Sequence, residues 1–70
     1  MSELLIVNRA ISGNRMAIRK EDVVTFYEDE IEVDDETKKC VKIELQNHSF
    51  DWVKVNNKFD YILNNIKEEK

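Results

Sequence analysis

The sequence predicts an α+β fold, a small antiparallel β-sheet of four or five strands followed by one C-terminal α-helix packed on the sheet. Two observations predict it. Between residues 3 and 55, short runs carry apolar side chains at every second position, which is the period of a strand. From residue 57 the spacing becomes that of a helical stripe, formed by Phe59, Ile62, Leu63 and Ile66.

The chain of 70 residues is expected to form one domain over residues 1–70. A chain of this length buries only about 60% of the surface of its unfolded form, so its core is marginal. Cys40 is the only cysteine and therefore forms no internal disulfide. Without a signal sequence, this cysteine content predicts a reducing, cytoplasmic setting. Oligomerisation is the expected source of further stability.

The first two strands are predicted at residues 3–11 and 15–19, joined by a turn at residues 12–14, where Gly13 allows the positive φ of a tight turn. The first strand is apolar on both faces, so we expect it to be central in a sheet or pressed against a second subunit. In the second strand, Met16 and Ile18 share one face and two arginines share the other.

A corner at residues 20–22 leads to an extended segment at residues 23–33 and then to a polar connection at residues 34–39. Residues 40–46 alternate strictly, which predicts a strand with Val41, Ile43 and Leu45 facing inward.

A second turn at residues 47–49 precedes a last strand at residues 50–55, in which we expect Phe50 and Trp52 to dominate the buried area. Asn56 or Asn57 is expected to cap the helix.

Seven acidic residues lie among the nine positions from Glu28 to Glu36. Ile31 and Val33 interleave with them, so the pattern predicts a strand with these two side chains facing inward; a calcium loop would require a glycine at its sixth position. Either this is a solvated hairpin, or its carboxylates bind a partner. The candidate partner-binding residues are Glu28, Glu30, Glu32, Asp34 and Asp35.

Lysines follow the acidic stretch closely. We expect residues 28–33 to pair with residues 39–44, which would bring Lys38, Lys39 and Lys42 near the carboxylates and neutralise part of their charge.

Three arginines form the other candidate site. Arg9, Arg15 and Arg19 could bind an anion, a nucleotide or a nucleic acid, because guanidinium groups match phosphate geometry. The alternative is that they are exposed residues flanking a hairpin. The net charge of −4 opposes nonspecific attraction to phosphate backbones and favours a basic partner.

No motif for catalysis or cofactor binding is present, so we expect no enzyme, no cofactor and no metal. The sequence offers one pairing of a nucleophile with a base, Cys40 with His48, but Cys40 is expected on the outer face of a strand and His48 in a turn. The longest apolar run, residues 4–7, is far too short to cross a membrane, and no membrane partner is expected.

With the turn ISGN, the strand RMAIR, the segment EDVVTFYED, the strand CVKIELQN and the helix FDYILNNIK, the chain resembles small flagellar-operon proteins of the FlbD type. It is similar, more loosely, to one half of a LytTR-type DNA-binding sheet. The FlbD-type resemblance implies this strand order and a flagellar or motility accessory role. The chain departs from that family in its Ser12-Gly13 turn, where the family has Asn-Gly, and in the longer connection expected at residues 34–39.

The leading functional expectation is a non-catalytic binding module, a small bacterial or phage accessory protein that acts by binding a basic protein surface. We expect it to form a homo-oligomer, most simply a dimer. The alternatives are a nucleotide or nucleic-acid binder that uses the arginines, and a flagellar accessory protein.

Overall fold

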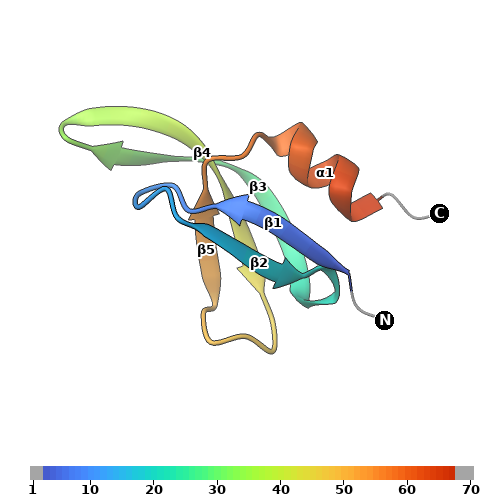
Figure 1. The fold of residues 1–70 in the computed structure, drawn as a ribbon. Coiled ribbons are helices and arrows are strands. Elements are labelled where there is room, and N and C mark those ends of the chain that lie inside the picture. The colour runs from blue at the N-terminus through green and yellow to red at the C-terminus, as the bar shows by residue number, and fades with distance from the viewer. Residues whose placement is uncertain (1–2, 68–70) are drawn as a thin grey trace.

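The computed structural model describes residues 3–67 and shows an α+β fold (Figure 1). Its elements are β1 (Leu4–Asn8), β2 (Arg15–Arg19), the 3-10 helix η1 (Lys20–Asp22), β3 (Val23–Val33), β4 (Glu36–Leu45), β5 (Trp52–Val55) and α1 (Phe59–Lys67). The predicted order of five strands and one helix is confirmed. The strands, however, form two antiparallel sheets, β1-β2 and β3-β4-β5, instead of one.

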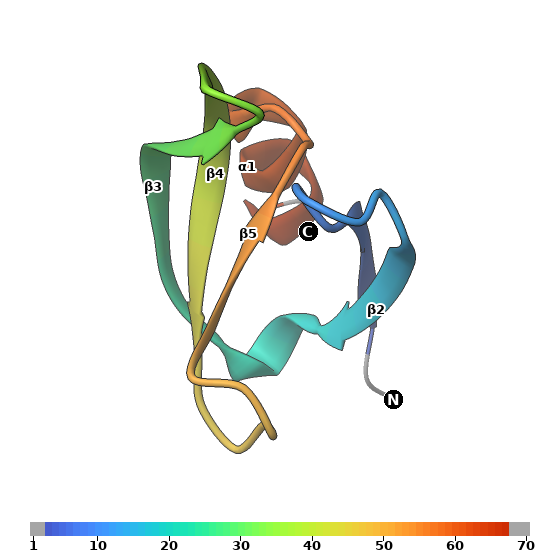
Figure 2. The same cartoon turned by 90° about the vertical axis from the view of Figure 1, so that its left-hand side faces the viewer.

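The two sheets face each other, with α1 at one end of the space between them (Figure 2). The core fills this space and draws on both sheets and the helix. Its buried members are Leu5, Val7, Ile18, Val41, Ile43, Leu45, Val53, Val55 and Ile62. A few backbone bonds join the sheets: the amide of Ala10 donates to the carbonyl of Lys54 at 2.9 Å, and the amide of Asn56 donates to the carbonyl of Asn8 at 2.8 Å.

The β1–β2 hairpin turns at Gly13, whose φ of 77° confirms the predicted turn. Of the two arrangements expected for the first strand, the central position is wrong, because within residues 3–67 β1 pairs with β2 alone and leaves Leu4 54% and Ile6 41% exposed; contact with a second subunit stays a prediction. Residues near α1 cover the other edge of β1: the amide of Asn8 donates to Oδ1 of Asn57 at 2.7 Å, and the hydroxyl of Tyr61 donates to the carbonyl of Ile6 at 2.8 Å.

The β3–β4 hairpin closes through a turn of only two residues, Asp34 and Asp35, with φ values of 54° and 66°. Two consecutive positive φ values are the signature of a type I′ turn, and aspartate tolerates this region better than most residues. The polar connection expected at residues 34–39 is therefore too long, because residues 36–39 belong to β4. The register shifts accordingly, so residues 28–33 pair with residues 36–41.

A β-bulge between Val23 and Thr25 decides which face of β3 meets the core. One extra residue in a strand moves every later side chain to the opposite face. Phe26 and the glutamates at positions 28, 30 and 32 thus share the face of the buried Val41 and Ile43. The prediction that Ile31 and Val33 face inward is wrong, because they lie on the other face and outside the core.

The alternation of β4 is confirmed, since Val41, Ile43 and Leu45 are all buried. In β5, by contrast, the core residues are Val53 and Val55. The expected burial of the aromatic residues is wrong: Trp52 is 50% exposed, and Phe50 is 43% exposed and precedes the strand. The register places Trp52 opposite Glu44, on the face of the sheet that turns away from the core.

The predicted helix is confirmed as α1, and its Ile62 is fully buried. The helix begins at Phe59, and neither Asn56 nor Asn57 caps it. Both side chains instead bind the backbone of the first hairpin, since Asn57 accepts from the amide of Asn8 and Nδ2 of Asn56 donates to the carbonyl of Arg9 at 3.4 Å. Within residues 3–67, no helix is long and apolar enough to cross a membrane.

Candidate functional site

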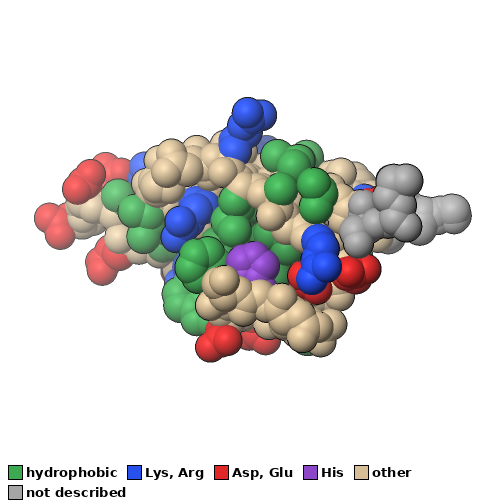
Figure 3. Space-filling model, turned by 60° about the horizontal axis from the view of Figure 1, so that its bottom comes forward, with side chains coloured by type: hydrophobic (Ala, Val, Ile, Leu, Met, Phe, Trp, Pro, Cys, Tyr) green, Lys and Arg blue, Asp and Glu red, His purple; other side chains and the backbone are tan. Residues whose placement is uncertain are grey.

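The far half of the β3–β4 hairpin projects from the body of the molecule (Figure 1). We name residues 28–39 the acidic arm. It gives the molecule an elongated shape, with extents of 42 × 25 × 18 Å. Acidic side chains gather at this end of the surface (Figure 3). The arm projects because it does not pack on the core. The first buried residue of β4 is Cys40, and residues 36–39, nearer the turn, are all exposed.

The five predicted carboxylates, those of Glu28, Glu30, Glu32, Asp34 and Asp35, are all exposed. None of them forms an ion pair with a cation in the described part of the chain. Of the three lysines expected to neutralise the arm, Lys42 helps to lower the pKa of Asp29, whereas neither Lys38 nor Lys39 forms a salt bridge within residues 3–67. Lys39 lies opposite Glu30 in the register without a salt bridge, and Nζ of Lys42 sits 4.6 Å from the centre of the Trp52 ring.

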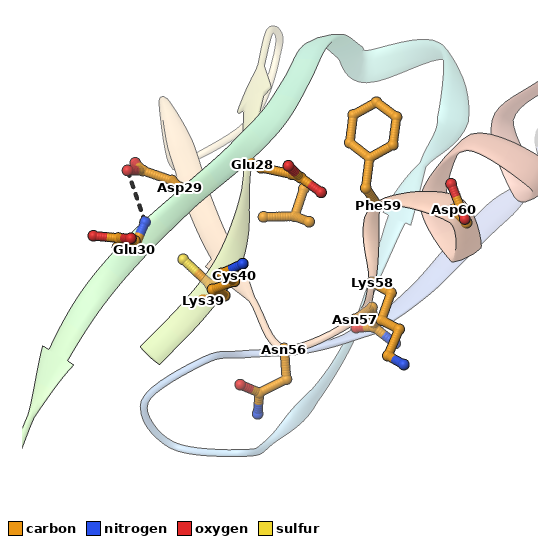
Figure 4. A pocket seen from close by; sticks show the side chains of 11 residues that line it. Glu28, Asp29, Glu30, Lys39, Cys40, Asn56, Asn57, Lys58, Phe59 and Asp60 are labelled. Carbon is orange, nitrogen blue, oxygen red and sulfur yellow. Dashed lines mark hydrogen bonds between the residues drawn. The ribbon is translucent and has the colours of Figure 1, made fainter. Parts of the chain in front are cut away.

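Asp29 and Lys54 hold the base of the arm against β5. Nζ of Lys54 lies 3.5 Å from Oδ2 of Asp29 and donates to the carbonyl of Glu30 at 3.1 Å. Oδ1 of Asp29 accepts from the amide of Glu30 at 2.8 Å (Figure 4). This hydrogen bond is the main cause of a lowered pKa of Asp29; the positive charge of Lys54 lowers the pKa further, although partial desolvation opposes it.

Sequence patterns do not predict this pair of residues. Asp29 counts only as one acid among seven, and Lys54 follows Trp52 by two positions on the same face of β5. Their contact depends on how the arm curves, which no local pattern specifies.

A hollow of about 540 Å³ lies between the base of the arm and the start of α1 (Figure 4). Its walls carry charges of both signs, from Glu28 and Asp60 and from Lys39 and Lys58. Among residues 3–67, no three His, Cys, Asp or Glu side chains lie close enough to hold a metal ion.

A second hollow, of about 650 Å³, lies between the β1–β2 turn, β5 and the arm. Its lining is partly apolar, because Ile11, Phe50 and Trp52 are exposed there. Cations stand over the aromatic rings: the guanidinium of Arg9 is 5.5 Å from the centre of Phe50, and Nζ of Lys54 is 6.0 Å from that of Trp52.

The structure does not bring the three candidate arginines together. Arg15 and Arg19 lie on the outward face of β2. Arg9 follows the inward-facing Val7 by two positions and lies on the opposite side of the hairpin. The Nε atom of Arg19 is bound at 3.0 Å to the carboxylate of Asp22, which is 4% exposed.

Cys40 and His48 lie beyond bonding distance of each other. The five steps along the strand from Cys40 to Leu45 alone span about 17 Å, and His48 lies beyond the Leu45 end. Burial raises the pKa of the Cys40 thiol, which keeps it protonated, and Nδ1 of His48 accepts from the amide of Phe50 at 3.1 Å.

Comparisons of the chain with protein-family models, with curated proteins and with solved structures found no match. The resemblance to FlbD-type proteins, and the motility role that it implies, stay predictions.

Proposed function

We propose that this protein is a non-catalytic binding module that acts by placing its acidic arm on a basic surface of a partner protein. One observation carries the proposal: the five exposed carboxylates at the projecting end have no ion pair within residues 3–67. The negative charge of these carboxylates is therefore available to attract a basic partner.

The physical effect of such an arm is mainly on encounter and orientation. A single exposed ion pair contributes only about 0.2 to 1 kcal/mol. Several carboxylates on one narrow projection, however, raise the local potential, accelerate association with a basic surface and disfavour acidic partners. Salt weakens this attraction because the charges are solvent-exposed.

The test compares two sets of neutralising substitutions with equal loss of charge. The arm set is Glu28→Gln, Glu30→Gln and Glu32→Gln; the control set, placed outside the arm, is Glu3→Gln, Asp51→Asn and Asp60→Asn. The probe is heptalysine, measured by calorimetry at several salt concentrations. We expect the arm set to weaken binding at least fivefold more than the control set and to reduce the salt dependence. Equal effects of the two sets would contradict the proposal.

We also propose that the protein self-associates, most simply as a dimer, in a reducing compartment where Cys40 stays a thiol. The outer face of the first hairpin supports this, because Leu4, Ile6 and Ala17 are exposed on it side by side. Sedimentation equilibrium at micromolar concentration is expected to give a dimer that Ile6→Lys dissociates. A monomeric wild-type protein would contradict this part alone.

The arginine-based alternative receives less support, because Arg9 lies on the opposite side of the hairpin from Arg15 and Arg19. It would predict affinity for a nucleotide or nucleic acid that falls steeply with salt.

A further inference from the structure

The outer edge of β3 is an open strand edge. Among residues 3–67, β3 is the longest strand, with 11 residues, and it pairs only with β4. The hairpin closes through a two-residue turn, so the flanking residues Val33 and Glu36 form a hydrogen-bonded pair. Hydrogen-bonded pairs alternate with non-hydrogen-bonded pairs along antiparallel strands. The odd-numbered residues of β3 near the tip therefore direct their amides and carbonyls to β4. The amides and carbonyls of Phe26, Glu28, Glu30 and Glu32 consequently point away from the sheet.

The chain itself covers this edge at one residue. The amide of Glu30 donates to Asp29, and its carbonyl accepts from Lys54. The edge-facing backbone groups of Phe26, Glu28 and Glu32 have no partner elsewhere in residues 3–67. An open edge with unpaired groups is a template for an additional strand.

The side chains along this edge specify the strand that fits. Residues directly opposite each other in neighbouring strands share a face, with Cβ atoms about 4.5 to 5.5 Å apart. A residue opposite each of Glu28, Glu30 and Glu32 would meet a carboxylate, whereas the residues between them would lie on the face of Ile31, Val33 and Asp29, whose charge is already paired with Lys54. The matching sequence has a cation at every second position and an apolar β-branched residue between.

We propose that the edge of β3 accepts, as an added antiparallel strand, an extended segment of a partner protein in which lysine or arginine alternates with apolar residues. This inference rests on the proposed function and specifies the partner's form. Main-chain hydrogen bonds supply affinity, and the alternating charges fix the register.

A second copy of the chain fits this edge less well. If two β3 edges paired around Glu30, Glu28 would lie opposite Glu32 of the second copy, and like charges directly opposite each other are destabilising. The other open edge, that of β2, has only five residues, and its Arg19 is already bound to Asp22.

The incoming strand must replace the bonds that Asp29 and Lys54 make to Glu30. Asp29 therefore has two opposing effects: its charge attracts a basic segment, and its carboxylate occupies an amide that the segment needs. A purely electrostatic contact would depend only on the charge of Asp29. Strand addition would depend on both the charge and the occupied amide, so a substitution of Asp29 distinguishes strand addition from a purely electrostatic contact.

The experiment uses three peptides of identical charge, measured by fluorescence anisotropy. The first alternates four lysines with three valines, the second has the same residues with the valines grouped in the centre, and the third is the first with its two central lysines N-methylated. In the proposed pairing the lysine amides face the glutamate carbonyls, so N-methylation removes donors and keeps the charge. We expect the first peptide to bind at least tenfold more tightly than the others.

Substitutions in the protein provide the reciprocal test. Glu30→Pro removes an edge-facing amide, and Glu30→Gln is its control with the same loss of charge. We expect Glu30→Pro to abolish the preference for the alternating peptide and Glu30→Gln to retain it. Should Glu30→Pro fail to fold, as judged by circular dichroism, Asp29→Ala tests the same edge: it is expected to increase the preference for the alternating peptide even though it removes a negative charge.

The outcomes separate the two proposals. Equal binding of the three peptides, at an affinity that depends on the arm carboxylates, would overturn strand addition and leave the proposed function standing. Absence of binding by every peptide would contradict both. A third outcome is that the protein forms a dimer which does not bind the alternating peptide and which the substitution Arg15→Glu dissociates. That result would show that β2 of a second copy occupies the β3 edge, and it would overturn the inference.

Discussion

Replacing Asp35 with glycine is expected to stabilise the β3–β4 hairpin. Asp35 has a φ of 66°, and the left-handed region costs a residue with a Cβ roughly 1 to 2 kcal/mol, less for aspartate. Glycine avoids this cost but loses about 0.5 to 1 kcal/mol through its greater freedom in the unfolded chain. The expected net gain is about 0.5 kcal/mol, which for a domain of this size raises the Tm by about 2 to 4 °C.

The control for this substitution is Asp35→Asn, which removes the same charge but keeps a Cβ. Any gain from relieving the repulsion between Asp34 and Asp35 will appear in both variants, and the backbone effect will appear only in the glycine variant. Thermal unfolding followed by circular dichroism is expected to rank the Tm values glycine, asparagine, aspartate, from high to low. A glycine variant no more stable than the asparagine variant would refute the two-residue turn with positive φ.

The remaining predictions concern the core and two titrating groups. Ile43→Ala truncates a fully buried side chain and is expected to cost about 2 to 5 kcal/mol of stability, enough to unfold much of so small a domain. Trp52 is half-exposed, so Trp52→Ala should stay folded. Far-UV circular dichroism at 25 °C compares the two variants. The raised pKa of Cys40 implies stability that is present below the thiol's unfolded pKa and is lost as the pH rises through the higher folded value. The fall of the urea midpoint at alkaline pH should therefore be smaller in Cys40→Ala than in the wild type; the raised pKa of Tyr27 contributes the same kind of loss in both. The lowered pKa of Asp29 implies stability that is present above its ordinary pKa of 3.8 and is lost as the pH falls through the lower folded value. The urea midpoint of Asp29→Asn should therefore fall less than that of the wild type between pH 5 and pH 2.5.

Sequence patterns predicted those parts of the fold that local periodicity specifies. The alternation of β4 and the stripe of α1 each follow from a period that only one secondary structure satisfies. The turn at Gly13 follows from a residue that accepts a positive φ.

The rest depends on register, which a local pattern does not reveal. Nothing in the residues around Val24 predicts a bulge, and without it the faces of β3 are assigned the wrong way round. Trp52 is the largest apolar side chain, yet its position opposite Glu44 directs it away from the core. The division into two sheets arises from tertiary packing of the first hairpin against β5 and α1.

The sequence predicted which charged residues form the candidate site but not how they are arranged in space. The carboxylates of the arm are exposed, as their composition suggests. The contact of Lys42 with Trp52 and that of Asp29 with Lys54 depend on strand register and on the curvature of the hairpin. The open edge of β3 requires knowledge of strand order.

The bulge near Val24 makes the number of residues in this strand as important as their identity. Substitutions along residues 28–33 would change the attraction to a basic partner by degrees. The loss of one residue just before the Asp34 turn would instead move the preceding residues of β3 to the opposite face, bringing Ile31 to the side now held by Glu30. Related chains that bind in the same way are therefore expected to keep the length of this segment constant as well as its alternating carboxylates.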